Sequence, residues 1–211
     1  MKKYIIALMA SLAVVFAVQA QVQTEHISKL EIGKKAKKNF NNRDSSIVLH
    51  IDTLIMGDRA SLMFYGKKDV KLVVGHAEIG NRASISGTDG KNNGSNFDIQ
   101  VNFQKLGSLY VIAKGDDAFN GTKTNPNGNG GHVKITLAPN SIKPQQTDKK
   151  AKQYLYADVK AGGKAVNATS DLRNIYDRIK ISPGGLRGLP QGQIYSGSPG
   201  NEGSFEIITT E

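Results

Sequence analysis

The chain repeats one arrangement, in which a glycine-rich polar loop runs directly into an alternating β-strand. Three segments show it: GTDGKNNGSNFDIQV from Gly87, NGTKTNPNGNGGHVKITL from Asn120 and SGSPGNEGSFEIITT from Ser196. Their strands begin 36 and 72 residues apart, which predicts one repeat of about 36 residues with a degenerate copy between the last two. Glycine and asparagine suit such loops because tight turns with positive φ, and closely stacked backbones, exclude most other side chains. Turn and strand units that pair with their neighbours predict a solenoid.

Short runs of β-branched and aromatic residues, each ended by Gly, Asn or Asp, follow one another from Ser46 onward. In 97–103 and 133–137 apolar residues alternate with polar ones, as a half-buried strand requires. The predicted strands are 47–56, 60–65, 70–74, 83–86, 97–103, 108–113 and 133–137. Near 170–180 the apolar residues have helical spacing, so one short helix there is an alternative to a further strand.

These patterns predict an all-β protein, built as a parallel β-helix or a related β-solenoid with Gly/Asn-rich loops. Residues 47–211 form the repetitive β-domain in this interpretation. Residues 21–46 carry many lysines and only scattered apolar positions, so we expect a basic lead-in there. The polar stretch 143–152, which contains proline and glutamine, is expected to be a loop.

Residues 1–20 have the three parts of a secretory signal peptide. Lys2 and Lys3 precede an apolar run that is short for a membrane span, and Val18 and Ala20 put small side chains at the −3 and −1 positions of a cleavage site. We expect cleavage after Ala20 and export to the periplasm, the outer surface or the surroundings, with no transmembrane segment in the mature protein. The chain has no cysteine, which excludes disulfides, thiolate metal sites and cysteine nucleophiles.

A formal net charge of +10 favours polyanions as partners, such as an anionic polysaccharide, an envelope polymer or nucleic acid, although it also serves solubility alone. The densest positive cluster is a candidate polyanion-binding site, or else a solvated arm. It consists of Lys34, Lys35, Lys37 and Lys38. Nucleic acid is supported only by net charge, because no aromatic residues are interleaved with this cluster and no nucleic-acid module is recognisable.

No catalytic frame is recognisable around any of the four histidines, and no HExxH, Walker or Rossmann motif occurs. Carbohydrate-active enzymes with a β-helix fold use converging acidic residues or calcium. Asp89, Asp116 and Asp117 lie in expected loops that successive repeats can bring together, so they are candidate calcium ligands. The alternative is that each aspartate hydrogen-bonds its own turn and that the protein has no cofactor.

Two further features concern glycans. Thr53, within Asp52-Thr53-Leu54, resembles the short acceptor sequence for O-glycosylation of exported proteins in the Bacteroidetes. Tyr154 and Tyr156 alternate in sequence and therefore share one face of a strand, for which a core position is the favoured interpretation.

The stretches 112–117, 128–135 and 197–207 resemble Gly-rich, collagen-like or β-solenoid secreted proteins of bacteria, in which GGNGG-type loops precede a V-x-I strand. The resemblance implies a parallel β-helix and an extracellular or cell-surface setting, and it carries no catalytic residues. Glycine at every third position is not sustained, which excludes a collagen triple helix.

We therefore expect a non-enzymatic, exported cell-envelope or secreted β-protein. It would bind a surface polymer or act as an adhesion or matrix component, and matrix components self-associate. The alternative is a β-helix carbohydrate-active enzyme, of the polysaccharide lyase or hydrolase type, that acts on an acidic glycan.

Overall fold

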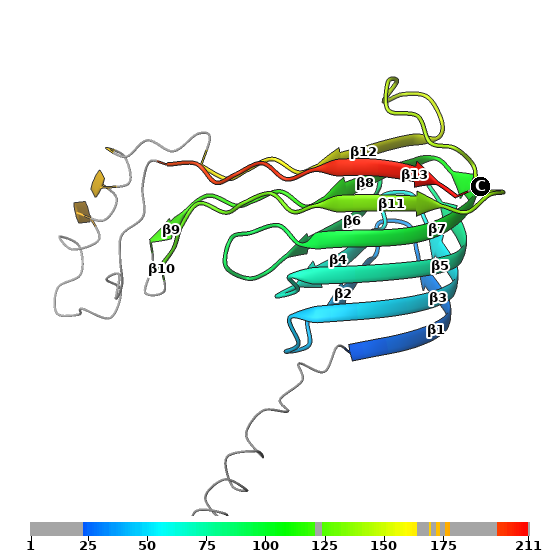
Figure 1. Ribbon diagram of the computed structural model, residues 1–211, viewed down its shortest axis with the longest axis horizontal. Coiled ribbons are helices and arrows are strands. Elements are labelled where there is room, and N and C mark those ends of the chain that lie inside the picture. The colour runs from blue at the N-terminus through cyan, green and yellow to red at the C-terminus, as the bar shows by residue number, and fades with distance from the viewer. Residues whose placement is uncertain are drawn as a thin grey trace, which may run out of the picture.

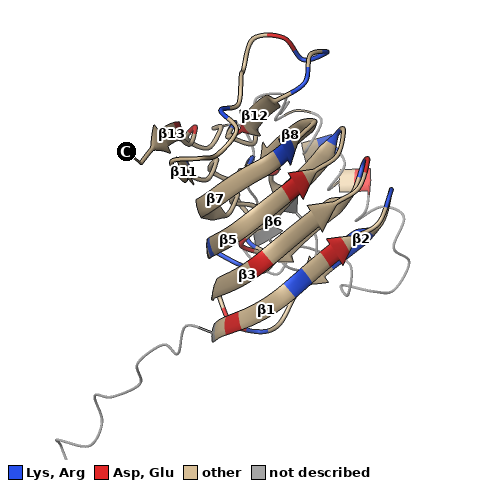
Figure 2. Cartoon of the chain, turned by 90° about the vertical axis from the view of Figure 1, so that its right-hand side faces the viewer, with Lys and Arg blue, Asp and Glu red and all other residues tan. Residues whose placement is uncertain are grey.

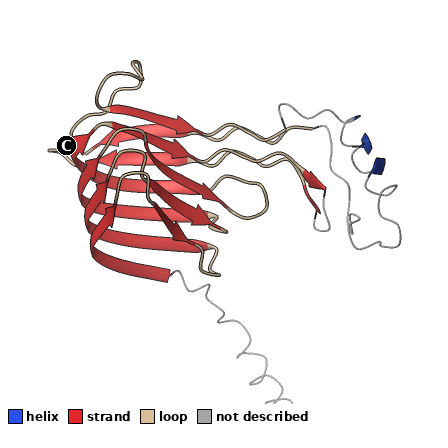
Figure 3. Cartoon of the chain, turned by 180° about the vertical axis from the view of Figure 1, so that it is seen from behind, coloured by secondary structure: helices blue, strands red, loops and turns tan. Residues whose placement is uncertain are grey.

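A computed structural model describes residues 23–120, 124–163, 169, 172–173, 176–177 and 198–210. The expected signal peptide lies outside these residues. So does most of the stretch near 170–180, of which the described residues, 169, 172–173 and 176–177, have helical backbone (Figure 3). No helix in the described part of the chain is long and apolar enough to cross a membrane.

The chain winds into a parallel β-solenoid, which confirms the predicted fold class (Figure 1). Six strands stack in the first sheet, in the order β1 (Gln23–Ile32), β3 (Ser46–Met56), β5 (Asp69–Ile79), β7 (Asn96–Leu106), β11 (Val133–Leu137) and β13 (Phe205–Thr209). Five strands form the second sheet, in the order β12 (Tyr154–Asp158), β8 (Ser108–Ile112), β6 (Ala83–Thr88), β4 (Ser61–Tyr65) and β2 (Lys37–Phe40). One strand of each sheet and the connections between them make one rung of the solenoid. A separate antiparallel pair joins β9 (Phe119–Asn120) to β10 (Thr124–Asn125).

The long strands wrap around two sides of the core because their inward positions change phase midway. In β3, Leu49 and Ile51 are buried, but the next buried residues are Leu54 and Met56, so two consecutive residues face outward between them. The strand β5 has the same pattern. Side chains alternate along a straight strand, so both buried sets reach one core only if the strand bends. The curvature of the long strands in Figure 1 shows this bend.

Buried residues of successive rungs stack in files. Leu49, Leu72, Ile99 and Ile135 are aligned by the pairing of β3, β5, β7 and β11, and none is more than 2% exposed. Burial of one such side chain contributes about 1.5–3 kcal/mol. These files stabilise a chain that has no cysteine and therefore no disulfide.

The rung length is not the predicted constant 36 residues. The equivalent serines of β4 and β6, Ser61 and Ser84, are 23 residues apart, and Asp69 and Asn96 are 27 apart. Val133 pairs directly with Phe205 across the 72-residue interval, so one rung with a long insertion occupies it and no degenerate copy lies between. The core fixes only the strand positions, and the connections vary freely in length.

The predicted boundary at residue 46 is also wrong, because the expected lead-in contributes the strands β1 and β2. Residues 23–32 pair in register with β3, and residues 37–40 pair with β4. This rung has a described neighbour on one side only, and its positions are more polar than those of the following rungs. Leu30 and Ile32 nevertheless reach the core.

Beside the sheets, five glycine-rich extended segments pack as a bundle: 92–95, 113–117, 126–131, 158–163 and 198–203. The central segment, 126–131, hydrogen-bonds to all four others, through backbone pairs such as Gly130 N–H to Asn201 O and Gly162 N–H to Gly128 O, both 2.9 Å. Hydrogen bonds in four directions distinguish this bundle from a sheet. A Cβ atom would overlap a neighbouring carbonyl oxygen at Gly94, Gly115, Gly128, Gly130, Gly131, Gly162, Gly200 and Gly203.

Candidate functional site

The turns between the two sheets repeat a short motif that contains a basic residue. Ile32-Gly33-Lys34-Lys35-Ala36, Met56-Gly57-Asp58-Arg59-Ala60 and Ile79-Gly80-Asn81-Arg82-Ala83 connect β1 to β2, β3 to β4 and β5 to β6. This repeat is visible in the sequence, but it was not predicted, because each copy contains only one glycine. In Figure 2 the turns lie side by side along one edge of the solenoid, with basic segments recurring in them.

The backbones of the three turns align their basic residues in one file along the solenoid. Lys35, Arg59 and Arg82 have φ angles of 59°, 59° and 57°, in the left-handed region. Lys35 N–H donates to Asp58 O at 2.9 Å, and Arg59 N–H donates to Asn81 O at 2.8 Å. Each turn therefore hydrogen-bonds the next, and all three side chains are exposed. The tight stacking also needs glycine, since a Cβ atom on Gly57 would lie 2.7 Å from Lys34 N.

The next rung breaks this regularity and leaves a hollow. In each of the other three turns, two residues separate the glycine from the alanine. Here only Ser108 separates Gly107 from Leu109, which pairs with Ala83, so this turn is one residue shorter. Arg82 N–H donates to Ser108 Oγ at 2.6 Å in place of a backbone carbonyl. The hollow has a volume of about 460 Å³ and is lined by Asn81, Arg82, Ser108, Tyr110, Lys149, Lys150 and Ala151.

The loop expected at 143–152 supplies two of these lining cations. Gln145 organises it: the side-chain oxygen accepts hydrogen bonds from Thr147 N–H and Asp148 N–H, at 2.8 and 2.9 Å, and the side-chain nitrogen donates to Asp148 O at 2.7 Å. The loop thus places Lys149 Nζ 5.8 Å from the centre of the Tyr110 ring. We name the set Lys34, Lys35, Arg59, Arg82, Lys149 and Lys150 the basic ridge.

Few acidic groups neutralise the positive charge of the basic ridge. The ion pairs among the described residues are His26–Asp52, Lys29–Glu31 and Lys71–Asp98, and none includes a ridge residue. The acidic group in the stacked turns is Asp58. Asn81 N–H, which donates to Asp58 Oδ1 at 2.8 Å, lowers the pKa of this carboxyl below its usual range, and the charges of Lys34 and Lys105 act in the same direction.

The structure separates the four lysines predicted to bind polyanions. Lys34 and Lys35 belong to the basic ridge, and Lys37 faces outward beside it on β2, opposite Ser61. Lys38 pairs with the fully buried Leu62, so it lies in an inward file at the end of the solenoid. Its Nζ atom lies 5.3 Å from the centre of the Phe40 ring.

The structure does not gather the three candidate calcium ligands into one group of metal-binding side chains. No group of three or more His, Asp or Glu side chains that could hold a metal occurs in the described part of the chain. Asp89 accepts hydrogen bonds from Lys91 N–H and from the backbone and side chain of Asn93, all within its own loop. Asp117 Oδ1 accepts a hydrogen bond from Gly163 N–H at 2.7 Å, within the bundle, where Asp116 is an exposed neighbour.

Thr53, the candidate glycosylation site, lies at the bend of β3 and is half-buried, with its backbone paired to Lys29 and His76. The core position favoured for Tyr154 and Tyr156 is wrong for Tyr156, whereas Tyr154 is buried, at 7% exposed. Leu155 between them is fully buried and belongs to the core. The two tyrosine side chains lie on the opposite face of β12, where both rings contact the Tyr110 ring of β8. Tyr154 is covered there, and Tyr156 is 37% exposed.

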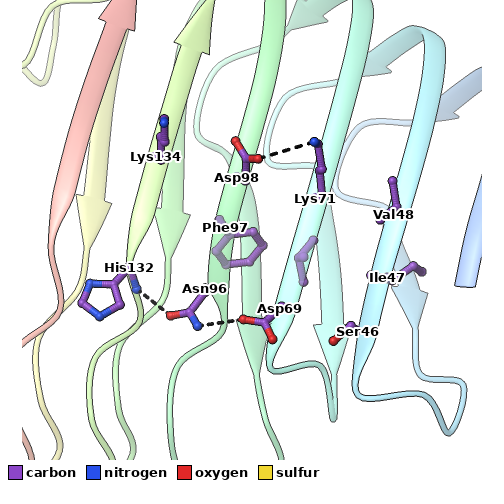
Figure 4. Close-up of a pocket in the computed structure, with 11 residues that line it drawn as sticks. Ser46, Ile47, Val48, Asp69, Lys71, Asn96, Phe97, Asp98, His132 and Lys134 are labelled. Atoms are coloured by element: carbon purple, nitrogen blue, oxygen red, sulfur yellow. Dashed lines mark hydrogen bonds and ion pairs between the residues drawn. The ribbon is translucent and has the colours of Figure 1, made fainter. Parts of the chain in front are cut away.

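A second depression, of about 420 Å³, lies on the outer face of the six-stranded sheet (Figure 4). Five of its polar lining residues are paired with one another. Asn96 donates to Asp69 Oδ1 at 2.9 Å, the Asn96 side-chain oxygen accepts from His132 N–H at 3.0 Å, and Lys71 pairs with Asp98 at 3.8 Å. Alternating charges along neighbouring strands give this face no preference for one sign of ligand charge.

No protein-family model matches the chain, and no curated protein or solved structure matches it either.

Proposed function

We propose that this chain is an exported, non-enzymatic binding protein whose basic ridge binds a linear anionic polymer of the cell envelope or its surroundings. The observation that carries the proposal is the file of Lys35, Arg59 and Arg82, which repeats one exposed cation on three successive rungs without an ion pair to a described residue.

The spacing of the file suits a repeating ligand. Hydrogen-bonded neighbouring strands lie about 4.8 Å apart, so a polymer that runs parallel to the solenoid axis meets a cation at each rung. A single exposed ion pair contributes little, about 0.2–1 kcal/mol. Several on one rigid frame act together, and the ridge then extends past the hollow to Lys149 and Lys150.

Export is supported by Lys2, Lys3, the apolar run and the small residues Val18 and Ala20. N-terminal sequencing of the protein recovered from outside the cytoplasm should show Gln21 as the first residue. Full-length protein confined to the cytosol would contradict this part of the proposal.

The ridge is tested by the triple variant Lys35→Asn, Arg59→Asn and Arg82→Asn. Asparagine tolerates positive φ, so the charges are removed without new backbone strain. We expect the affinity for an anionic polysaccharide at moderate salt to fall by about tenfold, the loss of three weak ion pairs. Elution from an anionic resin should shift to lower salt.

The matched control is the triple variant Lys68→Gln, Lys91→Gln and Lys134→Gln, which removes the same charge from exposed positions outside the ridge. It should retain most of the affinity. If both variants lose affinity equally, net charge alone drives binding and the ridge is not the site.

A further inference from the structure

The hollow at the short turn combines cations with an aromatic ring, a combination that the rest of the ridge lacks. We propose that it binds one sugar-acid unit, a saccharide ring that carries a carboxylate, and that the anionic polymer is therefore a polyuronate-type polysaccharide. This inference rests on the proposed function and names the ligand class of the same ridge.

The cations of the hollow suit a carboxylate. Arg82 enters from one side and Lys149 and Lys150 from the overhanging loop, and no described carboxylate forms an ion pair with any of them. The Arg82 guanidinium can donate two parallel hydrogen bonds to a carboxylate. Ser108 Oγ accepts from Arg82 N–H, so its own hydroxyl proton remains to donate to a ligand oxygen.

The aromatic component suits a saccharide ring. Tyr110 lines the hollow and is held by Tyr154 and Tyr156, with ring centres 5.8 and 6.3 Å away. A fixed ring offers an apolar surface to the C–H groups of a sugar, while the polar groups around it bind hydroxyls. The neighbouring tyrosine rings are inclined to Tyr110 by 58° and 62°, so they do not form a parallel slot for a nucleobase. Lys149 lies beside the ring and would form an ion pair with the ligand carboxylate. It could therefore keep its position when the sugar ring packs on Tyr110.

The test compares Tyr110→Leu with the matched Tyr110→Phe, which keeps the ring. Binding is measured by calorimetry with three probes: oligogalacturonate, polyphosphate and oligo-dT. Tyr110→Leu should weaken oligogalacturonate binding by about fivefold, the value of one aromatic contact, and leave polyphosphate binding within about twofold. Tyr110→Phe should bind oligogalacturonate like the wild type.

A second measurement is independent of how well the variants fold. Titration of the wild-type protein with oligogalacturonate should shift the NMR signals of the Tyr110 ring, and titration with polyphosphate should not. Equal loss of both ligands in Tyr110→Leu, or unshifted Tyr110 signals, would overturn the sugar-acid inference while leaving the ridge in place. So would stronger Tyr110-dependent binding of oligo-dT. The proposed function itself is rejected by a different result, namely an affinity of the Lys35, Arg59 and Arg82 triple variant that is no lower than that of its matched control.

Discussion

Gly130 lies where the bundle has no room for a methyl group. In the central segment, a Cβ atom added at this position would overlap the Val159 carbonyl oxygen and lie 2.8 Å from Gly203 N. The obstacle is backbone on both sides, so no side chain can rotate out of the way. The glycine content of these loops thus reflects the distance between chains more than the φ angle of each residue.

Gly130→Ala should therefore destabilise the protein, by about 3 kcal/mol, because the bundle must open to admit the methyl group. Gly33→Ala is the control, since a Cβ atom there meets nothing within 4 Å and φ is not positive. Urea denaturation should show a lower midpoint for the first variant and an unchanged one for the second. Equal midpoints would show that the bundle does not contribute to global stability.

Single residues also show what the sequence could predict of the site. Lys34 and Lys35 stood out through local charge density, but so did Lys38, whose inward position depends on its pairing with Leu62. Arg59 and Arg82 were not predicted, because each is an isolated cation whose alignment with Lys35 requires the register of the rungs. Lys149 and Lys150 reach the hollow only through the conformation of their loop.

At the scale of elements, the alternation of apolar and polar residues was sufficient to predict the strands that have a neighbouring strand on each side. The seven predicted strands correspond to β3 to β8 and β11, whose inward residues are buried, and the strand expected to begin at Phe205 corresponds to β13. Strands β1 and β2 were not predicted, since this outermost described rung has fewer apolar positions. The repeat was predicted at the wrong length, because the glycine-rich loops belong to the rungs with the longest insertions.

Lys67 joins three loops at the edge where the short strands end. It is fully buried, its Nζ atom donates to Asn42 O at 3.2 Å and to Asp44 O, and its backbone N–H donates to Thr88 O at 3.0 Å. Burial lowers the pKa of the Lys67 amine below its usual 10.5, an effect that Asp44 partly opposes. The folded protein thus releases this proton at a lower pH than the unfolded chain does.

This difference predicts a pH-dependent stability. Between the lowered pKa of Lys67 and 10.5, the unfolded chain binds more protons than the folded one, so the free energy of unfolding rises with pH through that window. We expect the stability of the wild type relative to Lys67→Met to increase over the same window, in urea denaturation between pH 7 and pH 10.5. The variant also leaves two carbonyl groups without a donor, at a cost of about 1–3 kcal/mol.

Lys68→Met is the control for this experiment, because Lys68 is the exposed neighbour of Lys67. Its stability should follow the wild type at every pH. A pH-independent difference between the wild type and Lys67→Met would mean that the Lys67 amine is hydrated in the folded protein.

For the whole molecule, the end of the solenoid formed by the first described rung decides whether solenoids can stack into a fibre. Charged residues occupy inward files at this end: Glu25 is aligned with Leu49 and Lys38 with Leu62, and both leucines are fully buried. Inward-facing charges on an edge strand oppose pairing with another edge, because they would be desolvated in the contact. The first rung therefore covers the core and also discourages growth of the sheets beyond β1 and β2.

The double variant Glu25→Leu and Lys38→Leu should consequently associate, because it continues two apolar files to the open edge. Light scattering after size exclusion should show oligomers that increase with protein concentration. Lys29→Leu with Glu31→Leu changes the same residue types on the outer side of β1, where no core file ends, and should keep the size distribution of the wild type. If the control associates as strongly as the test variant, surface hydrophobicity alone is the cause. If neither associates, the charges of the first rung are not what limits stacking at this end.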